Sequence, residues 1–206
     1  MNERIEWTRV WRENADREIK RILLIGDSII DGSKGMIQKH LPEGYAITSF
    51  ATSKGVDDPF FIKEIELVCA QEDYQYEAVY FNSGLHFHEQ TPEVYGRNYR
   101  NALKALRSFL PNTPVILGLS TPLTDGVADP SKHETPITLR DTNKTVIAYN
   151  EQVKALAAEL ALPIFDAYGL MVPHPKLKIF DGVHFSEEGN LLLGQNIAEA
   201  IKKLLK

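Results

Sequence analysis

The sequence has little of what marks secreted, membrane-spanning or nucleic-acid-binding proteins. Cys69 is the single cysteine among 206 residues, which excludes an internal disulfide framework. No apolar run is long enough to cross a bilayer, and the charged first residues contain no apolar signal core. The formal net charge is -5 and no basic run occurs, which argues against a nucleic-acid surface. We therefore expect a cytoplasmic protein without membrane or nucleic-acid partners.

The rest of the composition is that of an ordinary globular protein. Hydrophobic residues make up 43% and charged residues 25% of the chain, and its length suits one domain with a full core. Short apolar runs alternate with segments of helical periodicity. The runs that resemble strands are 21–26, 45–50, 78–81, 114–119 and 163–165. This alternation predicts an α/β domain with a five-stranded, mainly parallel sheet and helices on both faces, in three layers.

The first twenty residues have a different pattern. Trp7, Val10 and Trp11 recur at helical spacing with charges between them. We expect residues 1–20 to form an amphipathic helix packed on a single domain of residues 21–206. Within that domain, residues 120–142 are polar and rich in proline, and a loop of this length is more often functional than idle. The helix after this loop is expected to begin near Val146.

A serine follows the first buried strand directly. The run Arg21–Ile25 is apolar after its first residue, stops at Gly26 and leads into Asp27 and Ser28. In open parallel sheets the ligand crevice lies outside the carboxyl ends of the strands, so Ser28 is placed to meet a substrate. The same pattern also suits an ordinary serine in a tight turn before a helix. A helix is expected to start after Ser33.

A histidine and an aspartate lie three residues apart before the last predicted helix. Asp181 and His184 share a glycine-containing loop, in which the carboxylate can meet the Nδ1 of the imidazole. A serine hydroxyl needs a base to take its proton, and a base works best when a third group fixes its tautomer. Ser28, His184 and Asp181 can supply these three roles. A capping aspartate beside a surface histidine is the alternative.

Two other loops at the same predicted sheet edge carry polar groups. Gly55 can present a backbone N–H without side-chain obstruction, and the segment 82–86 offers Asn82, Gly84 and His86. Acyl transfer needs such donors aimed at the developing oxyanion. These loops are therefore candidates for an oxyanion hole.

In these motifs the sequence resembles the SGNH (GDSL-like) hydrolases. Gly26-Asp27-Ser28 matches the first block of that family, Gly55 stands at the glycine of the second block, and Asp181-Gly182-Val183-His184 matches the final D-x-x-H block. The resemblance implies a flavodoxin-like sheet and a serine esterase or lipase-like activity, in a family that includes carbohydrate deacetylases and lysophospholipases. In the third block, usually G-x-N-D, His86 stands where asparagine is expected. We favour His86 as the side-chain donor, with Asn82 as the alternative.

These patterns predict a serine hydrolase that cleaves carboxylic esters with a small acyl group and needs no cofactor. Ser28 is the expected nucleophile, His184 the base and Asp181 its partner, and the expected partner molecule is a small ester. Two alternatives stay open at this point. The altered third block also suits a binding protein of the same fold with little turnover. The spacing of His86 and His88 suits, less well, a metal-dependent hydrolase.

Overall fold

The computed structural model describes residues 6–14, 16, 18–70, 75–86, 90–127 and 138–205. In sequence order, these residues contain strand β1 (Thr8–Arg12), β2 (Lys20–Gly26), α1 (Ser28–His40), β3 (Tyr45–Thr52), α2 (Pro59–Ala70), β4 (Tyr76–Phe81), α3 (Pro92–Phe109), β5 (Val115–Gly118), α4 (Arg140–Leu160), β6 (Ile164–Phe165), α5 (Ala167–Met171), the 3₁₀ turn η1 (Pro175–Leu177) and α6 (Glu187–Leu204).

The strands form one sheet in the order β1-β3-β2-β4-β5-β6. All neighbours are parallel except β1, which runs antiparallel to β3. The predicted α/β class with a mainly parallel sheet is confirmed. The chain winds from β2 to β3 on one side and then continues from β4 on the other side of β2. The carboxyl end of β2 is therefore the switch point, where open α/β sheets bind ligands.

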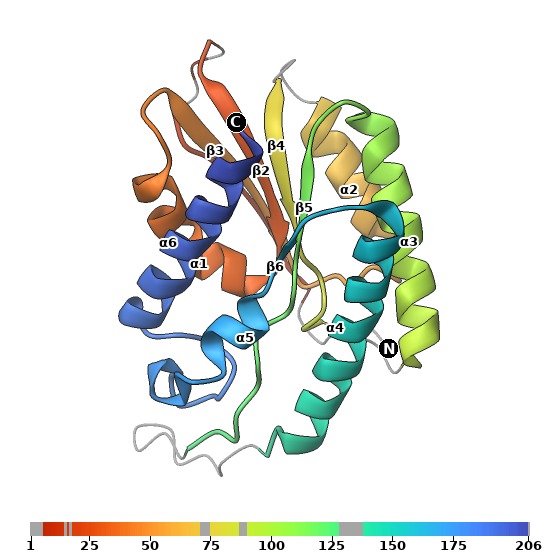
Figure 1. Ribbon diagram of the computed structural model, residues 1–206, viewed down its shortest axis with the longest axis vertical. Helices are drawn as coiled ribbons and strands as arrows, with labels where there is room; N and C mark the ends of the chain where they lie inside the picture. Colours follow the sequence, from red (N-terminus) through yellow and green to blue (C-terminus); the bar gives the residue numbers. More distant parts are fainter. Residues whose placement is uncertain are drawn as a thin grey trace.

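Helices cover both faces of the sheet (Figure 1). On one face Leu23 and Ile25 of β2 belong to the core that α2, α3 and α4 complete. On the other face Ile22 and Leu24 belong to the core of α1, α5 and α6. Burial on both faces explains why β2 is a continuous apolar run and does not alternate with polar residues.

The prediction of an N-terminal helix over residues 1–20 is wrong for the described part of that segment. Thr8–Arg12 is strand β1, and Thr8 pairs with Thr52 while Arg12 pairs with Thr48. The sheet therefore has six strands, not five. The backbone edge of β3 needs a hydrogen-bonding partner, and β1 provides it. An amphipathic helix would bury its apolar stripe, whereas Trp11 stays 51% exposed.

Two helices begin earlier than the sequence pattern predicts. Helix α1 begins at Ser28 itself and not after Ser33, and α4 begins at Arg140 and not near Val146. The single cysteine, Cys69, is half-buried beside the core on α2. Burial raises the pKa of this thiol to about 11, so it stays protonated and unreactive near neutral pH.

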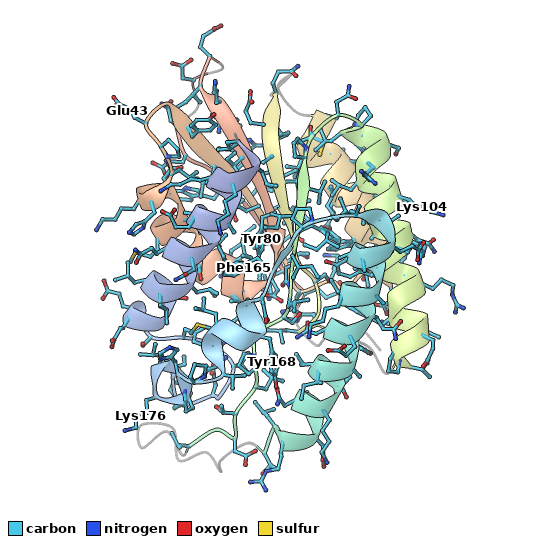
Figure 2. All side chains as sticks on the ribbon, in the orientation of Figure 1. Glu43, Tyr80, Lys104, Phe165, Tyr168 and Lys176 are labelled. Atoms are coloured by element: carbon cyan, nitrogen blue, oxygen red, sulfur yellow. The ribbon has the colours of Figure 1, made fainter. Side chains whose placement is uncertain are left out.

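Figure 2 shows how side chains are sorted between the interior and the surface. The rings of Tyr80 and Phe165 lie at the centre of the view, 6.2 Å apart between centroids. Glu43, Lys104 and Lys176 lie at the periphery and project outward. In the described part of the chain, no helix is both long enough and apolar enough to cross a membrane.

Arg21 is the exception to this sorting. It is 0% exposed, and its guanidinium donates to the carbonyl oxygens of Glu13 at 3.2 Å and Ile47 at 3.4 Å, and also to that of Asn14. These bonds tie the turn between β1 and β2 to β3. The buried charge is thus tolerated because backbone dipoles surround it.

The substitution Arg21→Met is expected to lower the free energy of unfolding by about 2–4 kcal/mol, because it leaves buried carbonyl groups without donors. Lys20→Met, at the exposed neighbouring position, is the matched control and should change it by less than about 0.5 kcal/mol. Urea unfolding of both variants measures the difference. Equal effects at the two positions would contradict the role given to Arg21.

Candidate active site

Ser28 lies at the junction of β2 and α1. Asp27 is the N-cap of α1, and its Oδ1 accepts a hydrogen bond from the backbone N–H of Ile29 at 2.9 Å. Ser28 is the first residue of the helix, where backbone N–H groups have no intrahelical acceptor. The helix dipole adds a partial positive charge at this end. The setting therefore favours negative charge that develops beside the serine.

The second part of the site is the loop before α6. Asp181 Oδ1 accepts hydrogen bonds from the backbone N–H groups of Val183 at 2.8 Å and His184 at 2.9 Å. Its Oδ2 lies 2.6 Å from Nδ1 of His184. Burial acts to raise the pKa of Asp181, but these hydrogen bonds outweigh it and lower the pKa below its ordinary value. The carboxylate is thus ionised and aimed at the imidazole.

The two parts meet through a hydrogen bond between residues 156 positions apart. His184 Nε2 lies 2.7 Å from Ser28 Oγ. Because Nδ1 faces a carboxylate, it carries the ring proton in the neutral imidazole, and Nε2 is left to accept the serine hydroxyl proton. The structure thus brings together Ser28, His184 and Asp181 in the order expected from the sequence.

The loop that carries Asp181 and His184 is anchored by the segment after β5. The backbone N–H of Thr124 donates to Gly182 O at 3.0 Å, and that of Val127 donates to Phe180 O at 2.8 Å. These bonds involve the first residues of the long segment 120–142, for which the sequence suggested a functional role. Residues 128–137 of that segment lie outside the described part of the chain.

The candidate oxyanion loops lie at the same sheet edge. Gly26 of β2 pairs with Ala51 of β3, and Asn82 N–H donates to Ile25 O at 3.0 Å, so the loops after β2, β3 and β4 are neighbours. A side chain at Gly55 would come within 2.5 Å of the carbonyl oxygen of His86. The Gly55 and His86 loops therefore touch, and only glycine allows this approach.

The loop after β4 contains Asn82, Gly84 and His86, and its two polar side chains make different contacts. The Asn82 amide donates to Gly118 O at 2.8 Å and to Ser120 Oγ at 3.3 Å, and it is 6% exposed. Gly84 is buried, and a side chain there would meet Ser120 Oγ at 2.2 Å. Both N–H groups of the Asn82 amide are therefore engaged within the fold, which leaves His86 as the better candidate donor.

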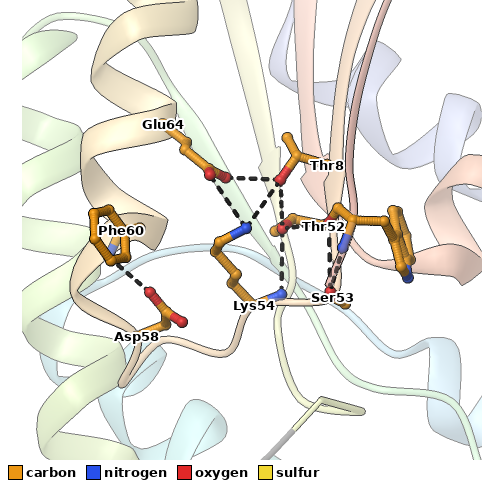
Figure 3. A network of polar contacts seen from close by, with 8 residues as sticks. Thr8, Thr52, Ser53, Lys54, Asp58, Phe60 and Glu64 are labelled. Atoms are coloured by element: carbon orange, nitrogen blue, oxygen red, sulfur yellow. Dashed lines mark hydrogen bonds and ion pairs between the residues drawn. The ribbon is translucent and has the colours of Figure 1, made fainter. Parts of the chain in front are cut away.

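Strand β1 contributes to this edge, which the sequence pattern did not indicate. Trp7, just before β1, packs edge to face on His86, with ring centroids 6.1 Å apart. Its backbone N–H donates to Ser53 Oγ at 2.9 Å. Figure 3 shows the adjoining network, in which Lys54 Nζ lies 3.2 Å from Glu64 and Thr8 Oγ1 donates to Glu64 at 2.8 Å.

The metal site considered for His86 and His88 cannot be built from the described residues. His88 lies outside them, and His86 contacts Trp7. Within the described ranges, no group of three or more histidine, cysteine, aspartate or glutamate side chains could hold a metal ion.

A serine, a histidine and an aspartate joined in this order at the switch point of an α/β sheet form the arrangement of a serine hydrolase. Residues 69–192 match the model of the GDSL-like Lipase/Acylhydrolase family. The chain belongs to this family of ester hydrolases. The matched range includes Asp181 and His184, whereas Ser28 lies before it.

Solved structures show the same fold at low sequence identity. An aryl esterase from M. smegmatis shares 18% identity, with a TM-score of 0.69, and the match covers 90% of this chain and 100% of that one. Est24, a carbohydrate acetylesterase from Sinorhizobium meliloti, also shares 18% identity, with a TM-score of 0.68 and coverage of 90% and 99%. A search of curated proteins finds no significant match.

Gly182 leaves no room for a side chain in the loop that carries Asp181 and His184. Its φ is +72°, and an added Cβ would lie 2.1 Å from the carbonyl oxygen of Thr124. Gly182→Ala should therefore lower the free energy of unfolding by about 3 kcal/mol or more, since a backbone clash adds to left-handed strain. Gly44, with φ of +84° and nothing within 4 Å of an added Cβ, provides the control. Gly44→Ala should cost only about 1–2 kcal/mol, and chemical denaturation of both variants tests the ranking.

Proposed function

We propose that this protein hydrolyses carboxylic esters with a small acyl group, using Ser28 as the nucleophile, His184 as the base and Asp181 as its partner. The hydrogen-bond chain from Ser28 Oγ through His184 to Asp181, with distances of 2.7 and 2.6 Å, carries this proposal. The family membership supports the reaction class.

In the first half of the reaction, Ser28 Oγ attacks the ester carbonyl carbon and its proton passes to His184 Nε2. The carbonyl oxygen becomes an oxyanion in the tetrahedral intermediate. Asp181 stabilises the imidazolium, which then gives the proton to the departing alcohol oxygen as the carbon–oxygen bond breaks. In the second half, water attacks the acylated serine, His184 takes and returns a proton, and the carboxylic acid leaves.

The oxyanion requires donors that are in place before charge develops. The backbone N–H groups of Ser28 and Gly55 and the imidazole of His86 are our candidates. Ser28 begins a helix, and Gly55 touches the His86 loop, which supports a shared site at this edge. Trp7 packs against the His86 ring and would hold it in one orientation. Donors fixed in this way lower the barrier without reorganisation during the reaction.

The proposal of a small acyl group requires a substrate series to test it. The named structural neighbours, an aryl esterase and a carbohydrate acetylesterase, are consistent with acetyl esters as first substrates to try. A p-nitrophenyl ester series from acetate to longer chains, together with an acetylated sugar, tests this choice.

Ser28→Ala should reduce ester turnover by about 10⁴-fold or more, because the three residues act as a unit. Turnover of p-nitrophenyl acetate measures the loss, and thermal unfolding checks that the variant folds. Ser108→Ala, on the exposed end of α3, is the matched control and should keep full activity. Undiminished turnover in Ser28→Ala would contradict the proposed nucleophile. A parent protein that binds esters without turnover would instead favour the binding-protein alternative.

His86→Ala should lower kcat by roughly 10²–10³-fold with little change in KM, since an oxyanion donor acts only when charge builds up. His86→Asn should recover part of this loss by restoring an N–H donor. Asn82→Ala should act mainly on stability, because its amide bonds Gly118 and Ser120. Steady-state kinetics and thermal unfolding of the three variants separate these effects. The reverse ranking would assign the oxyanion to Asn82.

A further inference from the structure

Lys178 is a largely buried cation that the proposed mechanism does not use. It forms an isolated antiparallel bridge with Phe185, so these two residues close the base of the loop that carries Asp181 and His184. Within this loop, the backbone N–H of Ile179 donates to His184 O at 2.9 Å. Lys178 thus lies where the loop begins, and its side chain turns back toward Val183 within the loop.

The contacts of the Lys178 ammonium lie within the same loop. Its Nζ donates to the carbonyl oxygen of Val183, the residue between the buried Gly182 and His184. It also lies 3.6 Å from the centroid of the Phe185 ring, which is 6% exposed. A cation is attracted to the face of a desolvated aromatic ring. Both contacts hold the ammonium against the backbone that positions the imidazole.

The negative charges of two carboxylates attract this ammonium, one on the His184 loop and one next to Ser28. Asp181 belongs to the same loop, and Asp27 caps the helix that begins with Ser28. Asp27 is 3% exposed, and its Oδ2 accepts no hydrogen bond from the residues that the structure describes. Burial lowers the pKa of Lys178 to about 7, and the charges of Asp181 and Asp27 oppose this effect. The ammonium is therefore protonated below neutral pH.

This placement has a physical consequence for the base. The hydrogen bond to Val183 restrains the peptide next to His184, and a restraint of the base near its productive geometry favours proton transfer. A residue without a donor at position 178 would remove this restraint.

We propose that Lys178 is a positioning residue of the candidate active site, which holds the loop of His184 through the carbonyl oxygen of Val183. This proposal rests on the proposed function, since it describes how the base of that reaction is held in place.

The test is the measurement of kcat and of KM for p-nitrophenyl acetate, followed as acetate release near neutral pH. The variants are K178R, which keeps charge and donor, K178Q, which keeps a donor only, and K178M, which keeps neither. K176M removes a charge from an exposed position two residues away and is the matched control. Thermal unfolding reports whether each variant folds.

In K178M we expect kcat to fall by about tenfold with KM unchanged, since the restraint on Val183 is lost. K178R, which keeps the donor, and the control K176M should keep the parent kcat, and K178Q should recover part of the loss. K178Q and K178R decide the test if K178M does not fold.

Three results would overturn the proposal. An unchanged kcat in K178M would show that the restraint has no effect on the base. An equal fall of kcat in K176M would assign the effect to overall surface charge. Unfolding of all three Lys178 variants would leave the residue a structural role only. A parent without esterase turnover would instead overturn the proposed function itself, which is a distinguishable outcome.

Discussion

Burial of β2 on both faces is the constraint on which the rest of the structure depends. Ile22, Leu23, Leu24 and Ile25 are each 0% exposed, and the strand pairs with β3 on one edge and β4 on the other. A strand that is packed on both faces and paired on both edges cannot shift its register without exposing apolar side chains. Its carboxyl end is therefore a rigid place for Ser28, and the loops after β3 and β4 are brought beside it.

The candidate catalytic groups are held by short local bonds, and a few long-range contacts bring these local units together. Asp181 and His184 orient each other within one turn, and Asp27 caps the helix of Ser28. Hydrogen bonds from the segment after β5 then fix the Asp181 loop in space. Local hydrogen bonds therefore set the geometry within the Asp181–His184 turn and at the start of α1. The long-range contacts only have to bring these two segments together.

Strand β1 shows how an element at the edge of a sheet can reach a functional site. Its pairing with β3 satisfies an open backbone edge and brings Trp7 against His86. The polar network of Thr8, Lys54 and Glu64 joins the same strand to α2 and to the loop of Gly55 (Figure 3). The segment that looked peripheral thus supports the edge where we propose that the oxyanion binds.

The sequence by itself determined the elements whose signals are local. Apolar runs marked the parallel strands, and the Gly-Asp-Ser and Asp-Gly-Val-His motifs marked Ser28, Asp181 and His184, because strand burial and turn chemistry act over a few residues. Only the tertiary structure decided the rest. Trp7, Val10 and Trp11 suit a helix by spacing, and the open edge of β3 made that segment a strand. The use of Asn82 and part of the charge that acts on Lys178 likewise depend on groups distant in sequence, at Gly118 and Asp27, which no local pattern can bring together.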